Sequence, residues 1–179
     1  NNTHQVEQQD HDNVEHPRLD AWPNIAKSAS SEHLRRGCAA HLEQTQGHGQ
    51  RRAQIVQTVG ERRKGKKCKG MEGLVEEGSE VMGEDFEGSL MDAALIGAAQ
   101  RVEHYEIAAY GTVCAFAEEL GATEQAELLN ETLEEEKETD EKLSKLAEQI
   151  NTEANAGGGE EAEPEVEAHK DKRKARRVA

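Results

Sequence analysis

The sequence has 179 residues and a formal net charge of −15; 34% of its residues are hydrophobic, 33% are charged and only 3% are aromatic. This length suits one domain with tails, and the abundance of Ala, Glu, Leu, Gln and Lys favours helices over sheet. The acidic charge argues against nucleic acid as the main partner, because phosphate repels an acidic surface. No apolar run of about 18 residues is present, so we expect no membrane span.

The first half of the chain predicts two helices joined by a short turn. We expect a polar segment over residues 1–13 and a first helix over 14–29, interrupted by Pro17 and Pro23. The run Ser30-Ser31-Glu32 reads as a tight turn with a helix N-cap. A second helix is predicted over residues 33–59.

The second half predicts another pair of helices. A basic, glycine-rich connection leads to a short helix over residues 71–82. A third long helix is predicted over 90–120, ending at Gly121, and a fourth over 123–151. Residues 152–179 have the composition of a disordered, charged tail.

The lengths of the connections indicate the fold class. Short turns join the first helix to the second and the third to the fourth, which makes two antiparallel hairpins. The long link between the hairpins allows a crossover. We therefore predict an all-α, ferritin-like antiparallel four-helix bundle over residues 14–151, with an extra short helix in the crossover.

The third helix carries an acid within its apolar seam. The seam residues recur at alternating spacings of four and three and comprise Leu95, Ala99, Val102, Ala109, Val113 and Phe116. The member of this series between Val102 and Ala109 is Glu106. A carboxylate in the middle of an inward-facing row requires an explanation.

The other long helices have polar seam residues at the same height. Glu136 and Asp140 lie in the fourth helix, His48 in the second and Glu15 in the first. Each lies about as far from its hairpin turn as Glu106 does from its own, and equal distances mean equal heights in an antiparallel pair. We therefore expect these five side chains to converge.

Three neighbouring residues complete the expectation for this region. Glu103 is one turn from Glu106 and is either a further acid of the site or a flanking surface residue. His41 is expected one turn from the site. His104 points away from the seam and is expected at the surface.

Several buried carboxylates require positive charge nearby. A dinuclear iron or manganese centre supplies it in carboxylate four-helix bundles, so the candidate metal ligands are Glu15, His48, Glu103, Glu106, Glu136 and Asp140. Alternatively, Arg52 or a protonated histidine neutralises the acids and forms a polar network without metal. The sequence assigns no catalytic residue.

Three strings, MEGLVEEGSEVM, DAALIGAAQRVEHYEIAAYGT and LLNETLEEEKETDEKL, closely resemble the YciE/YciF family of bacterial ferritin-like stress proteins. HLEQTQGH and IAKSASSEHLR resemble the family's first hairpin. The resemblance covers about residues 14–151 and implies a ferritin-like, dimeric, cytoplasmic protein linked to stress. The chain departs from the family at Pro17, at Gln44, where many relatives have glutamate, and at Arg52.

A homodimer is also expected from apolar residues that the main seam does not use. They comprise Met71, Val75, Met82, Ile96 and Ile107. The odd, scattered set of Cys38, Cys68 and Cys114 makes no disulfide framework, and no signal peptide is visible, which favours the cytoplasm.

Three functions are open at this stage. The first is a dinuclear metal protein that reacts with a small oxidant, dioxygen or peroxide. The second is a non-enzymatic dimeric stress protein with a vestigial or metal-free polar core. The third is iron sequestration, which requires a hollow cage.

Overall fold

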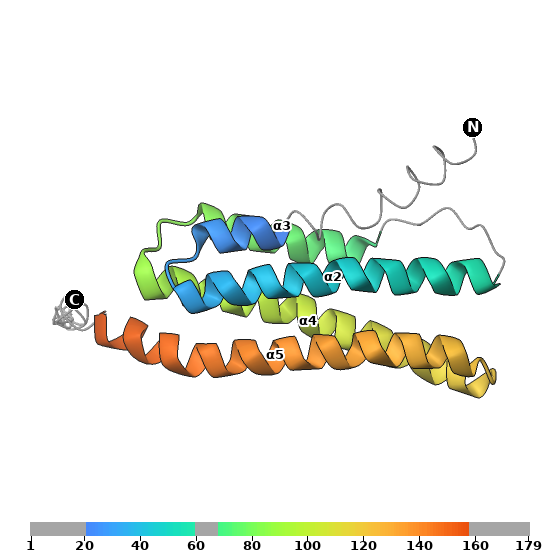
Figure 1. Cartoon of the computed structure of the whole chain (residues 1–179). Coiled ribbons are helices and arrows are strands. Elements are labelled where there is room, and N and C mark those ends of the chain that lie inside the picture. Colours follow the sequence, from blue (N-terminus) through green and yellow to red (C-terminus); the bar gives the residue numbers. More distant parts are fainter. Residues whose placement is uncertain (1–20, 60–67, 158–179) are drawn as a thin grey trace, which may run out of the picture.

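The computed structural model describes residues 21–59 and 68–157, which are helical apart from short connections (Figure 1). Residues 21–28 are helical and are followed by α2 (Glu32–Val59), α3 (Lys69–Gly83), α4 (Gly88–Glu119) and α5 (Thr123–Gly157). The prediction of an all-α, ferritin-like bundle is confirmed. Of the helices in this part of the chain, none combines the length and apolar character that a membrane crossing requires.

The helices α4 and α5 form the long hairpin that the sequence predicts. They lie side by side along their lengths (Figure 1). Gly121 follows α4 with φ +68°, a backbone conformation that glycine adopts without steric cost. The helix α5 is longer than expected and continues past Asn151 to Gly157.

A buried carboxylate holds the turn before α2. The hydroxyl of Ser31 accepts a hydrogen bond from the Leu34 amide, as expected of an N-cap. The carboxylate of Asp92, on α4, accepts hydrogen bonds from the Ser30 amide at 2.7 Å and the Ser31 amide at 2.8 Å. Asp92 therefore joins the first hairpin to α4.

The short helix α3 lies in the connection between α2 and α4 and packs against α4. Val81 and Met82 contact the apolar core, and Met71 is buried. At Gly70 a Cβ atom would lie only 2.8 Å from the ring of Tyr105 on α4, so glycine permits this close approach.

Two apolar clusters fill the described bundle. The first joins residues 22–29 to α2, α4 and α5 and contains Trp22, Ile25, Ala29, Leu34, Cys38, Met91, Leu95, Ile96, Ala99, Leu143 and Ile150. The second lies toward the Gly121 turn and contains Tyr110, Cys114, Ala117, Ala126, Leu129 and Leu133. Between them is a layer of buried polar residues, called here the polar layer: His41, Thr45, His48, Glu103, Glu106, Thr132, Glu136 and Thr139.

Beyond Ala99 the buried row of α4 differs from the expected seam, apart from Glu106, which belongs to both. The expected row continued through Ala109, Val113 and Phe116, but Val113 is 44% and Phe116 62% exposed. The buried residues follow the series Ala99, Glu103, Glu106, Tyr110, Cys114 and Ala117. These steps match about 3.6 residues per turn. The expected row kept a seven-residue repeat, which drifts about 20° per repeat around a straight helix.

Several predictions concern residues outside the described ranges. They are the polar segment at 1–13, the start of the first helix at 14–20 with Glu15 and Pro17, and the tail from residue 158. Pro23, expected to interrupt the first helix, lies within the helical residues 21–28.

The Asp92 contact gives the first testable prediction. Asp92→Asn should lower the free energy of unfolding by about 2 to 3 kcal/mol, because two backbone amides lose a charged acceptor. Denaturant unfolding followed by circular dichroism measures this loss. The control Asp85→Asn removes an exposed carboxylate just before α4. Equal stability of the two variants would contradict the role of Asp92 as a clamp.

Candidate metal centre

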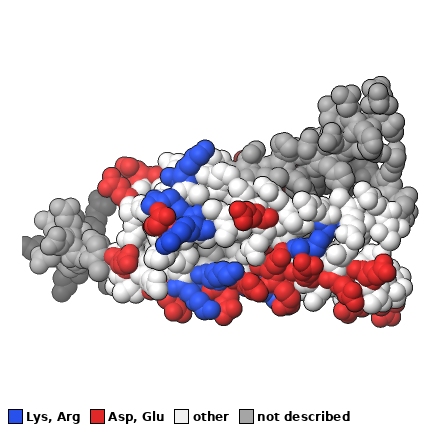
Figure 2. Space-filling model, viewed as in Figure 1, with Lys and Arg blue, Asp and Glu red and all other residues white. Residues whose placement is uncertain are grey.

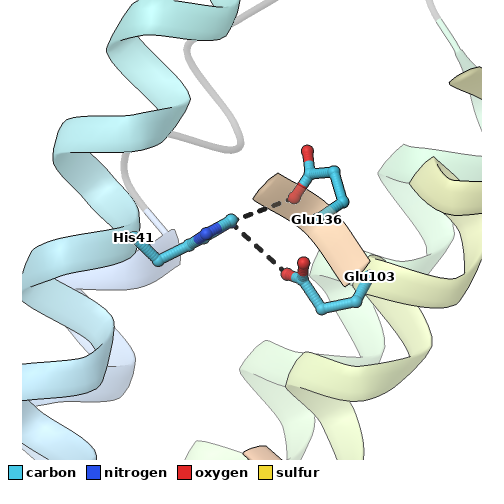
Figure 3. Close-up of side chains that lie close together, drawn as sticks. All are labelled: His41, Glu103 and Glu136. Carbon is cyan, nitrogen blue, oxygen red and sulfur yellow. Dashed lines mark ion pairs between the residues drawn. The ribbon is translucent and has the colours of Figure 1, made fainter. Parts of the chain in front are cut away.

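Three buried side chains from three helices converge in the polar layer (Figure 3). They are His41 of α2, Glu103 of α4 and Glu136 of α5. One possible ligand atom from each lies within 4.8 Å of the other two. The Nε2 atom of His41 is 3.4 Å from Oε1 of Glu103 and 3.5 Å from Oε2 of Glu136. Both carboxylates are fully buried, with 0% exposure.

His48 extends this group along the bundle axis. It lies two turns after His41 on α2, and its Nδ1 atom is 3.1 Å from Oε1 of Glu136. The two oxygens of Glu136 thus face two different imidazoles. Glu106 lies one turn after Glu103 on α4 and is among the residues that lower the pKa of Glu136. Glu136 therefore contacts both buried histidines of the polar layer.

The outer nitrogen of each histidine is held by α5. His41 Nδ1 is 2.9 Å from the hydroxyl of Thr139, which donates to the carbonyl oxygen of Glu135 at 3.0 Å. His48 Nε2 is 2.7 Å from Oε2 of Glu135. In each ring, therefore, one nitrogen faces an outer partner, Thr139 or Glu135, and the other nitrogen faces the buried carboxylate of Glu136. In metal sites, such outer contacts fix the tautomer and orientation of ligating histidines.

Glu136 is the most strongly perturbed acid of the group. Burial raises the pKa of its carboxyl. Hydrogen bonding with His48, Glu106 and Glu103, together with the charge of His41, lowers that pKa. This lowering outweighs the effect of burial, so the pKa of Glu136 lies well below its ordinary range. Like-charged carboxyls that share protons in this way favour one ionised member. The surroundings of Glu136 therefore favour its ionised form.

Apolar side chains separate the centre from water. Trp22 is 4% exposed, and its ring centroid lies 4.5 Å from that of His41 in an edge-on contact. Tyr110, of the second apolar cluster, lies edge-on to His48 with ring centroids 6.4 Å apart. Charges interact more strongly in such a region than in water.

The structure brings together most of the residues expected from the sequence. His48, Glu103, Glu106 and Glu136 share the polar layer, and Glu103 is an inward acid rather than a surface residue. Glu15 lies outside the described residues. His41 was expected one turn away from the site, but it lies within it.

Asp140 is placed outside the group. Its side chain is 22% exposed and accepts a hydrogen bond from Gln100 at 3.0 Å. It also pairs with the exposed His104 at 3.1 Å. The neighbouring Thr139 takes the inward position. Adjacent residues point about 100° apart around a helix. An error of one residue in the predicted seam therefore assigns to the core a side chain that lies at its flank.

The thiols do not join the centre. Burial raises the pKa of Cys38 to about 12, and it also raises the pKa of Cys114. Both remain neutral thiols in the apolar clusters. Cys68 is exposed, and its sulfur contacts the hydroxyl of Tyr105 at 2.9 Å.

The donor set fits a transition metal. Carboxylate and imidazole ligands suit iron and manganese, and the group lies between helices, where bundles build such sites. His41, Glu103 and Glu136 offer one set of ligands. The second oxygen of Glu136 lies 3.1 Å from Nδ1 of His48, beside this set.

Comparison with known proteins agrees with the fold and with the sequence resemblance. Residues 6–156 match the family model described as a domain of unknown function, DUF892. The chain is 49% identical over 128 residues to Protein YciF of Escherichia coli K12, an alignment that covers 71% of this chain and 77% of that protein.

Two solved structures share the architecture. The crystal structure of the E. coli stress protein YciF matches with a TM-score of 0.72 and 46% identity, over 75% of this chain and 85% of that one. YcfI from Rhodopseudomonas palustris matches with a TM-score of 0.68 and 39% identity, over 70% and 80%. The chain therefore belongs to the YciE/YciF family, whose family model is DUF892.

Proposed function

We propose that this chain is a ferritin-like stress protein whose polar layer binds a dinuclear iron or manganese centre and reacts with dioxygen or peroxide. The observation that carries the proposal is the convergence of His41, Glu103 and Glu136 from three helices within 4.8 Å. The stress role is taken from the relative that is described as a stress protein.

The two ion positions share Glu136. One ion would be held by His41, Glu103 and Glu136, and the other by His48, Glu106 and Glu136. When bound, the pair of ions supplies the electrons that reduce a small oxidant. The protein contributes the buried, negatively charged ligands, and its apolar clusters restrict access of water to them.

The surface supports a partner other than nucleic acid. Figure 2 shows acidic side chains gathered along α5. The exposed acids of this helix include Glu127, Glu131, Glu134, Glu138, Glu141 and Glu148. Such a face repels phosphate. A cytoplasmic location remains part of this proposal.

A metal-free polar core is the second candidate. It is favoured by the contacts of His41 with Glu103 and Glu136 and of His48 with Glu136. Two imidazolium ions would offset the buried carboxylates without any metal. The protein would then act through its surfaces, as a non-enzymatic stress protein.

Metal titration separates these candidates. Trp22 is the chain's one tryptophan and touches His41. Binding of Mn²⁺ or Co²⁺ should therefore quench the intrinsic tryptophan fluorescence. His41→Gln and Glu136→Gln should each weaken binding at least tenfold, measured by calorimetry. The controls are His104→Gln and Glu138→Gln, which change exposed residues of the same types.

Metal content provides the independent readout. Protein purified from cells supplied with iron and manganese should contain close to two ions per chain by elemental analysis. Fluorescence that does not respond to metal, in protein that also contains none, would support the metal-free core instead.

The acidity of Glu136 predicts a pH dependence in metal-free protein. Because its folded-state pKa is lowered, its stabilising contribution is fully present above the ordinary glutamate pKa of about 4.3 and is lost as the pH falls below that value. The stability difference between wild-type protein and Glu136→Gln should thus shrink on acidification, measured by denaturant unfolding. A constant difference, as expected for the surface control Glu138→Gln, would show that Glu136 is not held as an anion.

We also propose a homodimer. The apolar residues first expected to need a partner are largely covered within the chain, since Met71 and Ile96 are buried and Ile107 packs against the second cluster. Other apolar residues, on α4 and directly after it, are exposed instead: Val113 by 44%, Phe116 by 62% and Leu120 by 82%. A two-fold dimer that uses this face would bury them.

Light scattering tests the dimer. Wild-type protein should have the mass of two chains at micromolar concentration, and Phe116→Glu with Leu120→Glu should reduce it to one. The control Val56→Glu, at an exposed residue of α2, should leave the mass unchanged. A monomeric wild type would contradict the dimer, and particles of cage size would favour iron sequestration.

A further inference from the structure

Glu135 occupies the space between the polar layer and the surface. It precedes Glu136 on α5, and its side chain is 27% exposed. Its Oε2 atom lies 2.7 Å from Nε2 of His48 and also contacts the guanidinium of Arg51. The side chain of Arg51 is only 15% exposed.

Arg51 is itself held in place by α5. Its Nε donates to the hydroxyl of Thr132 at 2.9 Å, and its Nη1 donates to Glu131 at 2.8 Å. The guanidinium is a rigid, planar donor, so these contacts fix the position it presents to Glu135. Glu135 is thereby anchored from its outer side.

The contact with Glu135 determines what His48 presents to the interior. A carboxylate accepts hydrogen bonds and, while ionised, donates none, so the His48 proton that faces Glu135 is on Nε2. Nδ1, the atom 3.1 Å from Glu136, is then the nitrogen that donates to this carboxylate in the metal-free protein and that offers its lone pair to an ion once the ring is neutral. His41 has a comparable outer partner in the hydroxyl of Thr139. This hydroxyl donates its proton to the backbone carbonyl of Glu135, so its oxygen can accept a hydrogen bond from Nδ1 of His41.

We propose that Glu135, anchored by Arg51, is a positioning residue that keeps the proton of His48 on Nε2 and turns Nδ1 toward the metal centre as a ligand. This inference rests on the proposed metal function for its consequence. The hydrogen bond itself is present without metal.

Two measurements test this role. In metal-free, ¹⁵N-labelled protein, the Nε2 proton of His48 should exchange slowly with solvent, and Glu135→Leu should abolish this protection. The same variant should bind Mn²⁺ and Co²⁺ about 10- to 100-fold more weakly by calorimetry, the usual loss for an outer partner of a ligating histidine. Glu135→Gln keeps an acceptor and should retain part of both properties.

The matched control is Glu138→Leu. It removes an exposed carboxylate one turn away on the same helix, whose described ion pair is with Lys142 rather than with Arg51 or His48. It should leave the protection of the His48 proton and the metal affinity unchanged. Arg51→Gln should also speed the exchange of the His48 proton and weaken metal binding, but by less than Glu135→Leu does. Circular dichroism of each variant verifies the fold.

The outcomes separate the two proposals. If wild-type protein binds metal and Glu135→Leu binds it as tightly as Glu138→Leu does, the positioning role is wrong and the metal function stands. If wild-type protein binds no metal, the metal function fails, and proton exchange alone decides about Glu135. Slow exchange that is lost in Glu135→Leu then supports the positioning role, and fast exchange in the wild type overturns it.

Discussion

The bundle depends on the compensation of negative charge within its polar layer. Glu103 and Glu136 are fully buried, and Glu106 is nearly so. A buried carboxylate without a partner costs several kcal/mol, a large fraction of the stability of a small domain. Because the imidazoles of His41 and His48 both face Glu136, α2 has to pack against α5 at this height. The charge of one residue thus determines how the two hairpins fit together.

The apolar parts of the molecule follow from this layer. One cluster lies on each side of it, so the long helices are held together above and below the acids. Contacts across the layer are polar and directional, whereas the clusters on either side stabilise by burial alone. Such a layer fixes the register between helices, since a shift by one turn would place carboxylates among Leu and Ile side chains. A metal centre or a pair of imidazolium ions would serve this structural purpose equally well.

The sequence predicts the fold and the height of the site, and the structure supplies the details. Helix periods and equal distances from the turns are sufficient to bring Glu106, Glu136 and His48 together. They do not distinguish Thr139 from Asp140, because adjacent residues differ by about 100° around a helix and both lie near the seam. The choice depends on the neighbours, since Gln100 and His104 bind Asp140 at the flank of α4. The roles of Glu135 and Arg51 depend on contacts between α2 and α5 that no single-helix pattern contains.

Gln44 shows how one substitution acts on both candidate functions. The family resemblance of the sequence leads to glutamate at this position, and the side-chain oxygen of Gln44 lies 3.4 Å from the hydroxyl of Thr139, next to His41. A glutamate there would add an acid beside a layer that already contains Glu103, Glu106 and Glu136, and its repulsion would have to be offset by protons or by an ion. The amide avoids that repulsion in the metal-free bundle. It also removes an anionic oxygen that a hard cation would prefer. The substitution therefore favours the metal-free state while leaving His41 and His48 in place, which is why metal affinity, rather than fold, separates the two functions.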